Sequence, residues 1–224
     1  MSILPKLIEV FEVEGFSIRT GLNPSHFGNH KEAPFTIAFK GDQVFSGYGG
    51  IALQEVMSIE LLCAELKPQN IFVIGNAWGW STIAFALAAP NAKVIAADPV
   101  VDEGQELTEL IITKEGLNAA TLKGASPEIT PQAAENFEEK KFDLVFVDGQ
   151  HENEVIMADT HAAVPYMRDT GVILYHDIIL TNLLVGFEKL IEKYGEGAHG
   201  AITYFEKFKL VESRWEVNND TGRP

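Results

Sequence analysis

From residue 51 onward, short apolar runs alternate with longer segments of helical periodicity, and this alternation constrains the fold more than any other feature of the sequence. The runs are too short for helices, and turn-forming or polar residues follow most of them, as they follow buried strands. The predicted strands are residues 71–74, 94–97, 120–122, 142–147 and 172–175, and the predicted helices are residues 51–66, 81–89, 103–115, 127–139, 154–166 and 183–194. Continuous apolar strands separated by helices predict an α/β fold, with a mostly parallel sheet covered on both faces.

The two ends of the chain differ in pattern from this core. Residues 1–50 show little sustained periodicity, so we expect an N-terminal leader that wraps the core or acts as a lid, followed by one domain at residues 51–224. Near the other end, the strand-like residues 201–205 and 208–215 are separated by the short junction 206–207. This spacing predicts a C-terminal antiparallel hairpin at the edge of the sheet.

The composition excludes several classes of function. There are 17 Lys and Arg residues against 32 Asp and Glu residues, a net charge of −15, and this field repels phosphate backbones and anionic lipids. We therefore expect neither a nucleic-acid nor a membrane partner. The single cysteine, Cys63, lies on the apolar face of a predicted helix and has no partner for an internal disulfide. Together with the lack of an apolar run of ~20 residues, this favours a cytoplasmic protein.

The turn after the first strand of the alternation has the pattern of a ligand cradle. Gly75 ends that strand, Gly79 follows it, and Ser81 or Thr82 can cap the next helix, whose free N–H groups would point into the same space. The alternative interpretation is a tight strand-to-helix turn that binds nothing.

Asp98 ends the second strand, where a carboxylate can accept hydrogen bonds from both hydroxyls of a ribose. The pattern therefore predicts nucleoside binding. A dinucleotide fingerprint would need glycines where this chain has Ala77 and Trp80, which argues against NAD. The sequences around Ser81 and Ser126 also lack the glycine that a nucleophile elbow requires after its serine.

A second group of polar residues follows two later strands. Asp148 and His151 come after one, and His176 and Asp177 after the other, so the side chains should converge on one crevice. Two carboxylates and an imidazole suit Mg²⁺ or another divalent cation, which would hold a substrate hydroxylate and lower its pKa. Alternatively, the aspartates cap helices and bind backbone amides locally, and His151 acts as a general base.

These residues resemble those of class I S-adenosylmethionine (SAM)-dependent methyltransferases. The likeness is to the small-molecule O-methyltransferase branch that includes the cephalosporin-hydroxylase-like and macrolide-sugar methyltransferases. The segments that carry it are VIGNAWGWST (73–82), VIAADP (94–99), LKGASPE (122–128), FDLVFVDGQHENEVIMAD (142–159) and GVILYHDI (171–178).

The resemblance implies a Rossmann-like, doubly wound sheet of seven strands and methyl transfer from SAM to a hydroxyl of a small molecule. In the family's pattern, the two glycines flank the methionine and ribose of SAM, the acid after the second strand holds the ribose hydroxyls, and Asp148 sits over the transferring methyl. The predicted cofactor-binding residues are Gly75, Asn76, Gly79, Ser81, Asp98, Ala125, Ser126 and Asp148, with Ala125 and Ser126 bordering the adenine. The predicted catalytic residues are Asp148 and His151, and the predicted metal ligands are Asp148, His176 and Asp177.

The chain also departs from the family's pattern. Val73 stands where the family usually has an acidic residue, and Trp78 and Trp80 are large for this turn. These departures leave open a non-catalytic binding protein that keeps the methyltransferase fold. A nucleotide-dependent oxidoreductase is a further alternative, which would need a pyrophosphate cradle that Ala77 and Trp80 do not offer.

The methyl acceptor has no recognisable motif in the sequence. Candidate substrate contacts in the leader are His26, Phe27, His30 and Tyr48, each of which is individually more typical of packing or surface. The apolar leader and the edge hairpin are also the surfaces through which a homodimer could form.

Overall fold

A parallel sheet of five strands forms the centre of the computed structural model, which describes residues 2–20, 36–46, 50–178, 183–194, 208–211 and 214–217. The strand order is β6-β5-β4-β7-β8, and every neighbouring pair is parallel. The strands are β4 (Asn70–Ile74), β5 (Lys93–Asp98), β6 (Ala119–Lys123), β7 (Phe142–Val147) and β8 (Met167–Tyr175). The predicted α/β fold is thereby confirmed.

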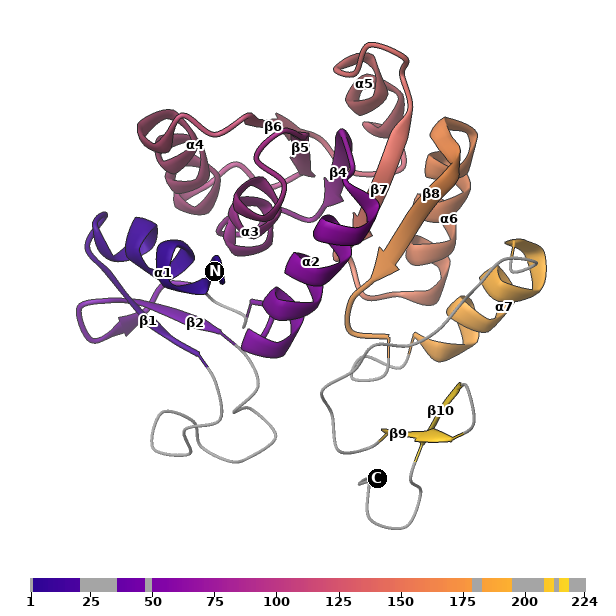
Figure 1. Ribbon diagram of the computed structural model, residues 1–224, viewed down its shortest axis with the longest axis horizontal. Coiled ribbons are helices and arrows are strands. Elements are labelled where there is room, and N and C mark those ends of the chain that lie inside the picture. The colour runs from indigo at the N-terminus through magenta and orange to yellow at the C-terminus, as the bar shows by residue number, and fades with distance from the viewer. Residues whose placement is uncertain are drawn as a thin grey trace.

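Helices cover both faces of this sheet. Alternate residues of β4 point to opposite faces, so that Ile71 and Val73 pack with α1 to α4, whereas Phe72 and Ile74 pack with α5 and α6. Figure 1 shows α2 and α6 on opposite sides of the sheet. The helices are α1 (Leu4–Glu12), α2 (Leu53–Leu66), α3 (Trp80–Ala88), α4 (Glu103–Glu115), α5 (Thr130–Glu135), α6 (Asn153–Ala163) and α7 (Leu184–Tyr194). The doubly wound arrangement follows from strands that are apolar on both faces.

The helix ends follow local signals in the sequence. The Asp102 side chain accepts a hydrogen bond from the Gly104 N–H at the start of α4, and Gly116 ends that helix with a φ of +62°. At the end of α2, Lys67 is left-handed and Pro68 follows it. These are ordinary N-cap and C-cap devices, and they fix where each helix meets the loops of the site.

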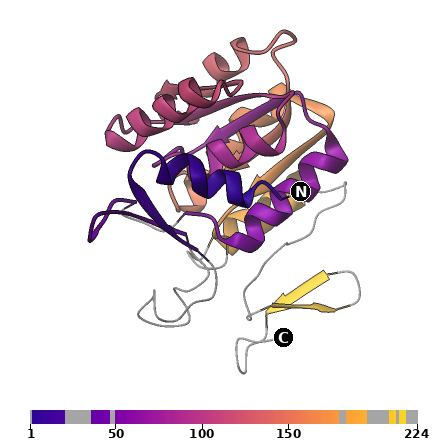
Figure 2. The same ribbon diagram turned by 60° about the vertical axis from the view of Figure 1, so that its left-hand side comes forward.

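The N-terminal 50 residues contribute to the core. They contain α1 and a three-stranded antiparallel sheet of β1 (Phe16–Arg19), β2 (Ile37–Lys40) and β3 (Gln43–Val44). Leu7, Val10 and Phe11 on α1 are buried in the same apolar cluster as residues of α2 and α3. Figure 2 shows the indigo helix α1 beside α2. The leader thus has regular elements where the sequence pattern indicated little periodicity. Its role as a lid stays a prediction.

The C-terminal hairpin is present, but its strands differ from those expected. β9 (Phe208–Val211) pairs antiparallel with β10 (Arg214–Val217), so the connection between them falls inside residues 208–215, which were predicted as a single strand. The predicted junction, residues 206–207, lies outside the described part. Residues 201–205 lie outside the described part. Among the described residues the central sheet has five strands where the resemblance implies seven, because the hairpin strands pair with each other and do not extend that sheet.

Two further findings concern single features. Cys63 is buried in the core as expected, and burial raises the pKa of its thiol to about 11. None of the helices that the structure describes has the length and apolar character needed to span a lipid bilayer.

Candidate active site

The candidate site lies where the strand order reverses. β5 and β6 lie on one side of β4, and β7 and β8 on the other, so the carboxyl ends of β4 and β7 border a topological switch point. Ligands of open α/β sheets bind in this position. Gly75 follows β4 and Asp148 follows β7, and the Asp148 N–H donates to the Ile74 carbonyl over 2.9 Å. The predicted cradle and the predicted acidic group therefore share one edge.

Gly75 is required by close approach of the two strand ends. Its φ is +95°, and a Cβ at this position would overlap the backbone carbonyl oxygen of Asp148. No residue with a side chain fits here without moving β7 away from β4. The glycine thus allows the loop after β4 to bend close to Asp148.

Asp98 holds the backbone of that loop. Its Oδ2 accepts hydrogen bonds from the N–H groups of Asn76 (3.0 Å) and Ala77 (2.9 Å), and its Oδ1 accepts one from Val100 (2.9 Å). Two N–H groups of the glycine loop are therefore bound by Asp98. They do not form the cradle for a pyrophosphate that a dinucleotide site needs.

Asn76 and Gly79 stabilise the same loop from inside. Asn76 is 2% exposed, its side-chain N–H donates to the Thr108 hydroxyl over 3.0 Å, and its carbonyl accepts from Thr82 over 2.8 Å. Gly79 has a φ of +90°, and a Cβ on it would overlap the Thr108 hydroxyl. Asn76 therefore directs its side chain into the protein, as does Ser81, which is 6% exposed. Their predicted part in cofactor binding stays a prediction.

Trp78 and Trp80 belong to the core beneath the leader. Their rings stack at a centroid distance of 5.3 Å, and Phe11 of α1 packs against both. The Trp80 Nε1–H donates to the Ile51 carbonyl over 3.1 Å. The size of the two indoles is thus explained by packing against α1, although they also line a small cavity of about 80 Å³ beside Gly75.

The loop after β6 reaches the same edge. The Gly124 N–H donates to the Asp98 carbonyl over 3.0 Å, which brings Ala125 and Ser126 to the side of the crevice formed by β5. Ala125 is exposed, and the Ser126 hydroxyl lies 3.1 Å from that of Thr130. The position agrees with the predicted adenine border, whose role stays a prediction.

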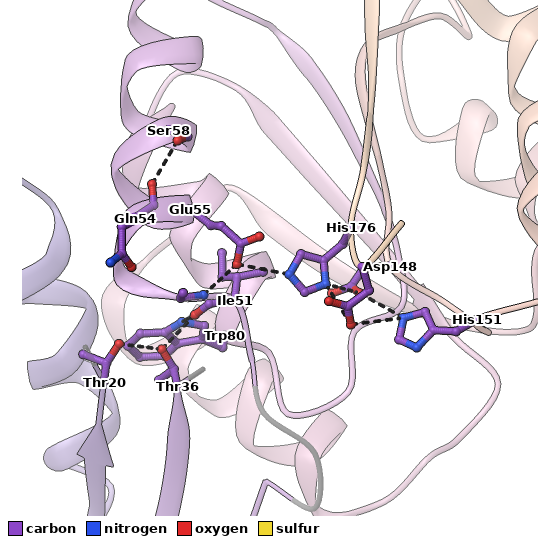
Figure 3. Close-up of polar contacts among 12 residues, drawn as sticks. Thr20, Thr36, Ile51, Gln54, Glu55, Ser58, Trp80, Asp148, His151 and His176 are labelled. Carbon is purple, nitrogen blue, oxygen red and sulfur yellow. Dashed lines mark hydrogen bonds and ion pairs between the residues drawn. The ribbon is translucent and has the colours of Figure 1, made fainter. Parts of the chain in front are cut away.

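Asp148, His151, His176 and Asp177 come together as predicted, and Figure 3 shows the first three of them. The Nδ1 of His176 lies 3.0 Å from the Asp148 Oδ1 and 3.4 Å from the Asp177 Oδ2. The Nε2 of His151 lies 3.5 Å from the Asp148 Oδ1 and 3.7 Å from the Asp177 Oδ2. Two carboxylates from the ends of β7 and β8 thus face two imidazoles.

The carboxylates and imidazoles of this group stabilise one another's charged forms. Burial raises the pKa of the Asp148 carboxyl, but the charge of His176 and the hydrogen bonds from His151 and His176 outweigh burial, and the pKa is lowered. The hydrogen bond to Asp148 raises the pKa of His151. Burial lowers the pKa of His176, but Asp148 and Glu55 outweigh this and raise it well above its usual value. Asp148 is therefore anionic at neutral pH.

The geometry favours His151 over His176 as a third ligand for a cation. Ligand atoms of Asp148, His151 and Asp177 all lie within 4.8 Å of one another. His176 is buried, and both of its ring nitrogens already contact carboxylates, since its Nε2 lies 3.1 Å from the Glu55 Oε2. The predicted role of His176 as a metal ligand stays a prediction. Each of its two ring nitrogens already contacts a carboxylate, which leaves neither nitrogen open to a cation.

Glu55 was not predicted from the sequence as part of the site. It lies on α2, and its carboxylate meets His176 across 121 positions of the chain. A glutamate three residues into a helix usually signals a capping box, but here the N-cap is Ala52, so the usual Ser or Thr is missing. His26, Phe27, His30 and Tyr48 lie outside the described residues.

The sequence matches a known family over this part of the chain. Residues 72–178 match the family model described as a methyltransferase domain. A curated relative, catechol O-methyltransferase B of Danio rerio, is 29% identical over 138 residues, which cover 60% of this chain and 46% of the relative. The match thus spans less than half of that relative's length.

Solved structures share the fold of this chain. The O-methyltransferase TomG from Streptomyces achromogenes, in complex with SAM, has a TM-score of 0.56 and 18% identity, over 66% of this chain and 71% of that one. The O-methyltransferase from Bacillus cereus, in complex with S-adenosylhomocysteine (SAH), has a TM-score of 0.53 and 20% identity over the same shares. These likenesses confirm the predicted Rossmann-like, doubly wound α/β fold.

Proposed function

We propose that this chain is a SAM-dependent O-methyltransferase that acts on a hydroxyl group of a small molecule, with a divalent cation at Asp148, His151 and Asp177. The observation that carries the proposal is the shared edge at the switch point. There the glycine loop after β4, the carboxylate of Asp98 at the end of β5 and the acidic group after β7 and β8 lie along the carboxyl edge of one sheet. The relatives named for O-methyl transfer and bound to SAM or SAH support it.

The loop geometry favours a nucleoside over a dinucleotide. Asp98 binds the N–H groups of Asn76 and Ala77, so these donors are not available to a pyrophosphate. Trp78 and Trp80 pack against Phe11 in the core. The size of these two side chains is therefore no argument for a non-catalytic protein.

The protein's share of the chemistry is alignment and proton transfer. SAM supplies a methyl group that is already activated on a sulfonium. The acceptor hydroxyl must lose its proton as its oxygen gains the methyl. Without a bound ion, the Nε2 of His151, the more exposed of the two imidazoles, can accept this proton. With an ion on that nitrogen, His151 would act as a ligand and the proton would leave a hydroxyl whose pKa the ion lowers. Because Asp148 raises the pKa of His151, the neutral base is favoured only at a pH above the usual value for histidine.

The residues present fit a hard or borderline divalent ion. Asp148 and Asp177 would provide carboxylate oxygens, and His151 would provide an imidazole nitrogen. Such an ion would lower the pKa of a bound hydroxyl. The proton on His151 competes with the ion, so affinity should rise with pH.

Calorimetry with SAM, SAH and NAD tests the nucleoside assignment. We expect SAM and SAH to bind and NAD not to bind. Asp98→Ala should weaken SAH binding by about 1–3 kcal/mol, through lost hydrogen bonds to ribose and to the loop. Binding of NAD alone would favour the oxidoreductase, and binding of none would favour a non-catalytic protein.

Divalent dependence is tested separately. Asp177→Ala should weaken Mn²⁺ binding, whereas Asp169→Ala, an exposed aspartate on β8, should not. Release of SAH with catechol as the first acceptor tried, with and without EDTA, reads out turnover. Turnover that is indifferent to EDTA would remove the ion from the proposal and leave His151 as the base.

A further inference from the structure

We infer that Glu55 on α2 is a positioning residue, which holds the imidazole of His176 and thereby the carboxylate of Asp148 in place. The inference rests on the proposed function, because it assigns Glu55 a role in that same site. His176 bridges the two carboxylates in Figure 3, with its Nε2 3.1 Å from the Glu55 Oε2 and its Nδ1 3.0 Å from the Asp148 Oδ1. Glu55 does not belong to the group that could bind a cation.

A buried imidazole held at both nitrogens cannot rotate without losing a contact. His176 is 6% exposed, and Phe146 lies beside its ring at a centroid distance of 6.0 Å. Without Glu55, the Nε2 would lose the only partner that the structure gives it among the described residues. The ring would then be free to turn, and Asp148 would lose its fixed donor.

Glu55 itself is well anchored. Its Oε2 also accepts a hydrogen bond from the Ala52 N–H over 2.8 Å, which completes the first turn of α2. The preceding carbonyl, that of Ile51, accepts hydrogen bonds from the Thr36 hydroxyl (2.7 Å) and from the Trp80 indole (3.1 Å). The start of α2 is therefore tied to the leader and to α3 at once.

This arrangement links the leader, α3 and the end of β7 through two oxygens, the Ile51 carbonyl and the Glu55 Oε2. The leader, through Thr36, and α3, through Trp80, hold the segment before α2. The Glu55 Oε2 connects that segment to His176 and so to the end of β7. A carboxylate that only capped α2 would not need to meet a buried histidine from β8.

The test must separate the contact with His176 from the cap of α2. Glu55→Ala removes both contacts. Glu55→Gln keeps an oxygen acceptor at the same distance from the backbone, so this variant should retain much of the Mn²⁺ affinity that Glu55→Ala loses. Glu60→Ala is the matched control, because Glu60 lies on the same helix and its carboxylate binds the Ile3 N–H at 2.6 Å, away from the site. If Glu55→Ala does not fold, Glu55→Asp, which is one methylene shorter, takes its place.

Mn²⁺ affinity in the full chain is the first measurement. Glu55→Ala should weaken Mn²⁺ binding about 10–100-fold, as removal of such supporting contacts usually does, and Glu60→Ala should leave it unchanged. In a His176→Gln background, Glu55→Ala should cause no further loss, because its effect passes through His176. An undiminished loss in that background would overturn the inference.

The imidazole N–H signals of His176 in ¹⁵N-labelled protein are the second measurement. A slowly exchanging N–H of His176 should be present in the wild type and in Glu60→Ala, and lost in Glu55→Ala. If the wild type binds no Mn²⁺, the metal part of the proposed function fails and this signal alone decides the role of Glu55. A His176 signal that persists in Glu55→Ala would show that Glu55 does not hold the ring.

Discussion

The carboxylate of Asp98 holds the loop after β4, and the proposed function gives it a second role toward the ribose. A carboxylate has about four lone-pair positions, and Asp98 uses three for the N–H groups of Asn76, Ala77 and Val100. About one position is left, which suffices for one ribose hydroxyl. The sequence-based prediction assigned both hydroxyls to this residue, because the loop contacts of a side chain cannot be read from its spacing.

Gly75→Ala tests the close approach of β4 and β7. The alanine would adopt a left-handed conformation, at a cost of about 1–2 kcal/mol, and would also overlap the Asp148 carbonyl. Gly15→Ala is the control, because Gly15 has a φ of +87° and no atom within 4 Å of its added Cβ. In urea unfolding, Gly75→Ala should lose about 1–3 kcal/mol more than Gly15→Ala. Equal losses would mean that the strand ends separate easily.

Asp159 on α6 should make stability fall as the pH rises. Burial raises the pKa of its carboxyl to about 6, despite a hydrogen bond from Ser126, and its Oδ1 has no hydrogen-bond partner among the described residues. An unfolded aspartate has a pKa of about 3.9. The folded protein therefore loses stability from about pH 4 through about pH 6, by about 3 kcal/mol in all.

Asp159→Asn removes this penalty. The variant should gain up to about 3 kcal/mol of unfolding free energy at pH 8 and close to nothing at pH 4, as measured by urea unfolding at both values. Asp169→Asn, an exposed change on β8, serves as the control. A gain of the same size at pH 4 would show that ionisation of Asp159 is not its cause.

At the scale of elements, the predictions held where local signals and tertiary packing agree. The helix predicted at residues 103–115 and the strand at residues 142–147 match α4 and β7, because caps or a bounded apolar run define them. The helix predicted at residues 127–139 is shorter in the structure, and α1 was missed although its apolar residues recur at helical spacing. The helical pattern of α1 is only nine residues long, and its stability comes from packing on α3.

Phe11→Ala tests whether α1 belongs to the core. Phe11 is fully buried and packs against Trp78 and Trp80, so the truncation should reduce the unfolding free energy by about 3–5 kcal/mol. Val13→Ala, at 69% exposure just after the same helix, should change it by less than about 0.5 kcal/mol. Denaturant unfolding of both variants makes the comparison. A small effect of Phe11→Ala would mean that the leader is only loosely attached.

At the scale of the whole molecule, topology explains which site residues could be predicted. The carboxyl ends of parallel strands meet at one edge, so Asp98, Asp148 and Asp177 could be placed together from the alternation alone. Glu55 could not, because it reaches the site from α2 in a different layer. The sequence predicted His176 as the histidine ligand, whereas the group that could bind a cation contains His151. This difference depends on side-chain burial, which the order of the strands does not reveal.

The net charge of −15 leads to a prediction for the whole protein. SAM carries one more positive charge than SAH, at the sulfonium, so an acidic protein attracts it more strongly. Raising NaCl from about 0.01 M to about 0.15 M shortens the Debye length from about 30 Å to about 8 Å. Calorimetry should then show SAM binding weakened by up to about 1 kcal/mol more than SAH binding, as expected for exposed charges. Comparison of the two ligands cancels any effect of salt on the fold, and an equal loss for both would show that the acidic surface does not act on the sulfonium.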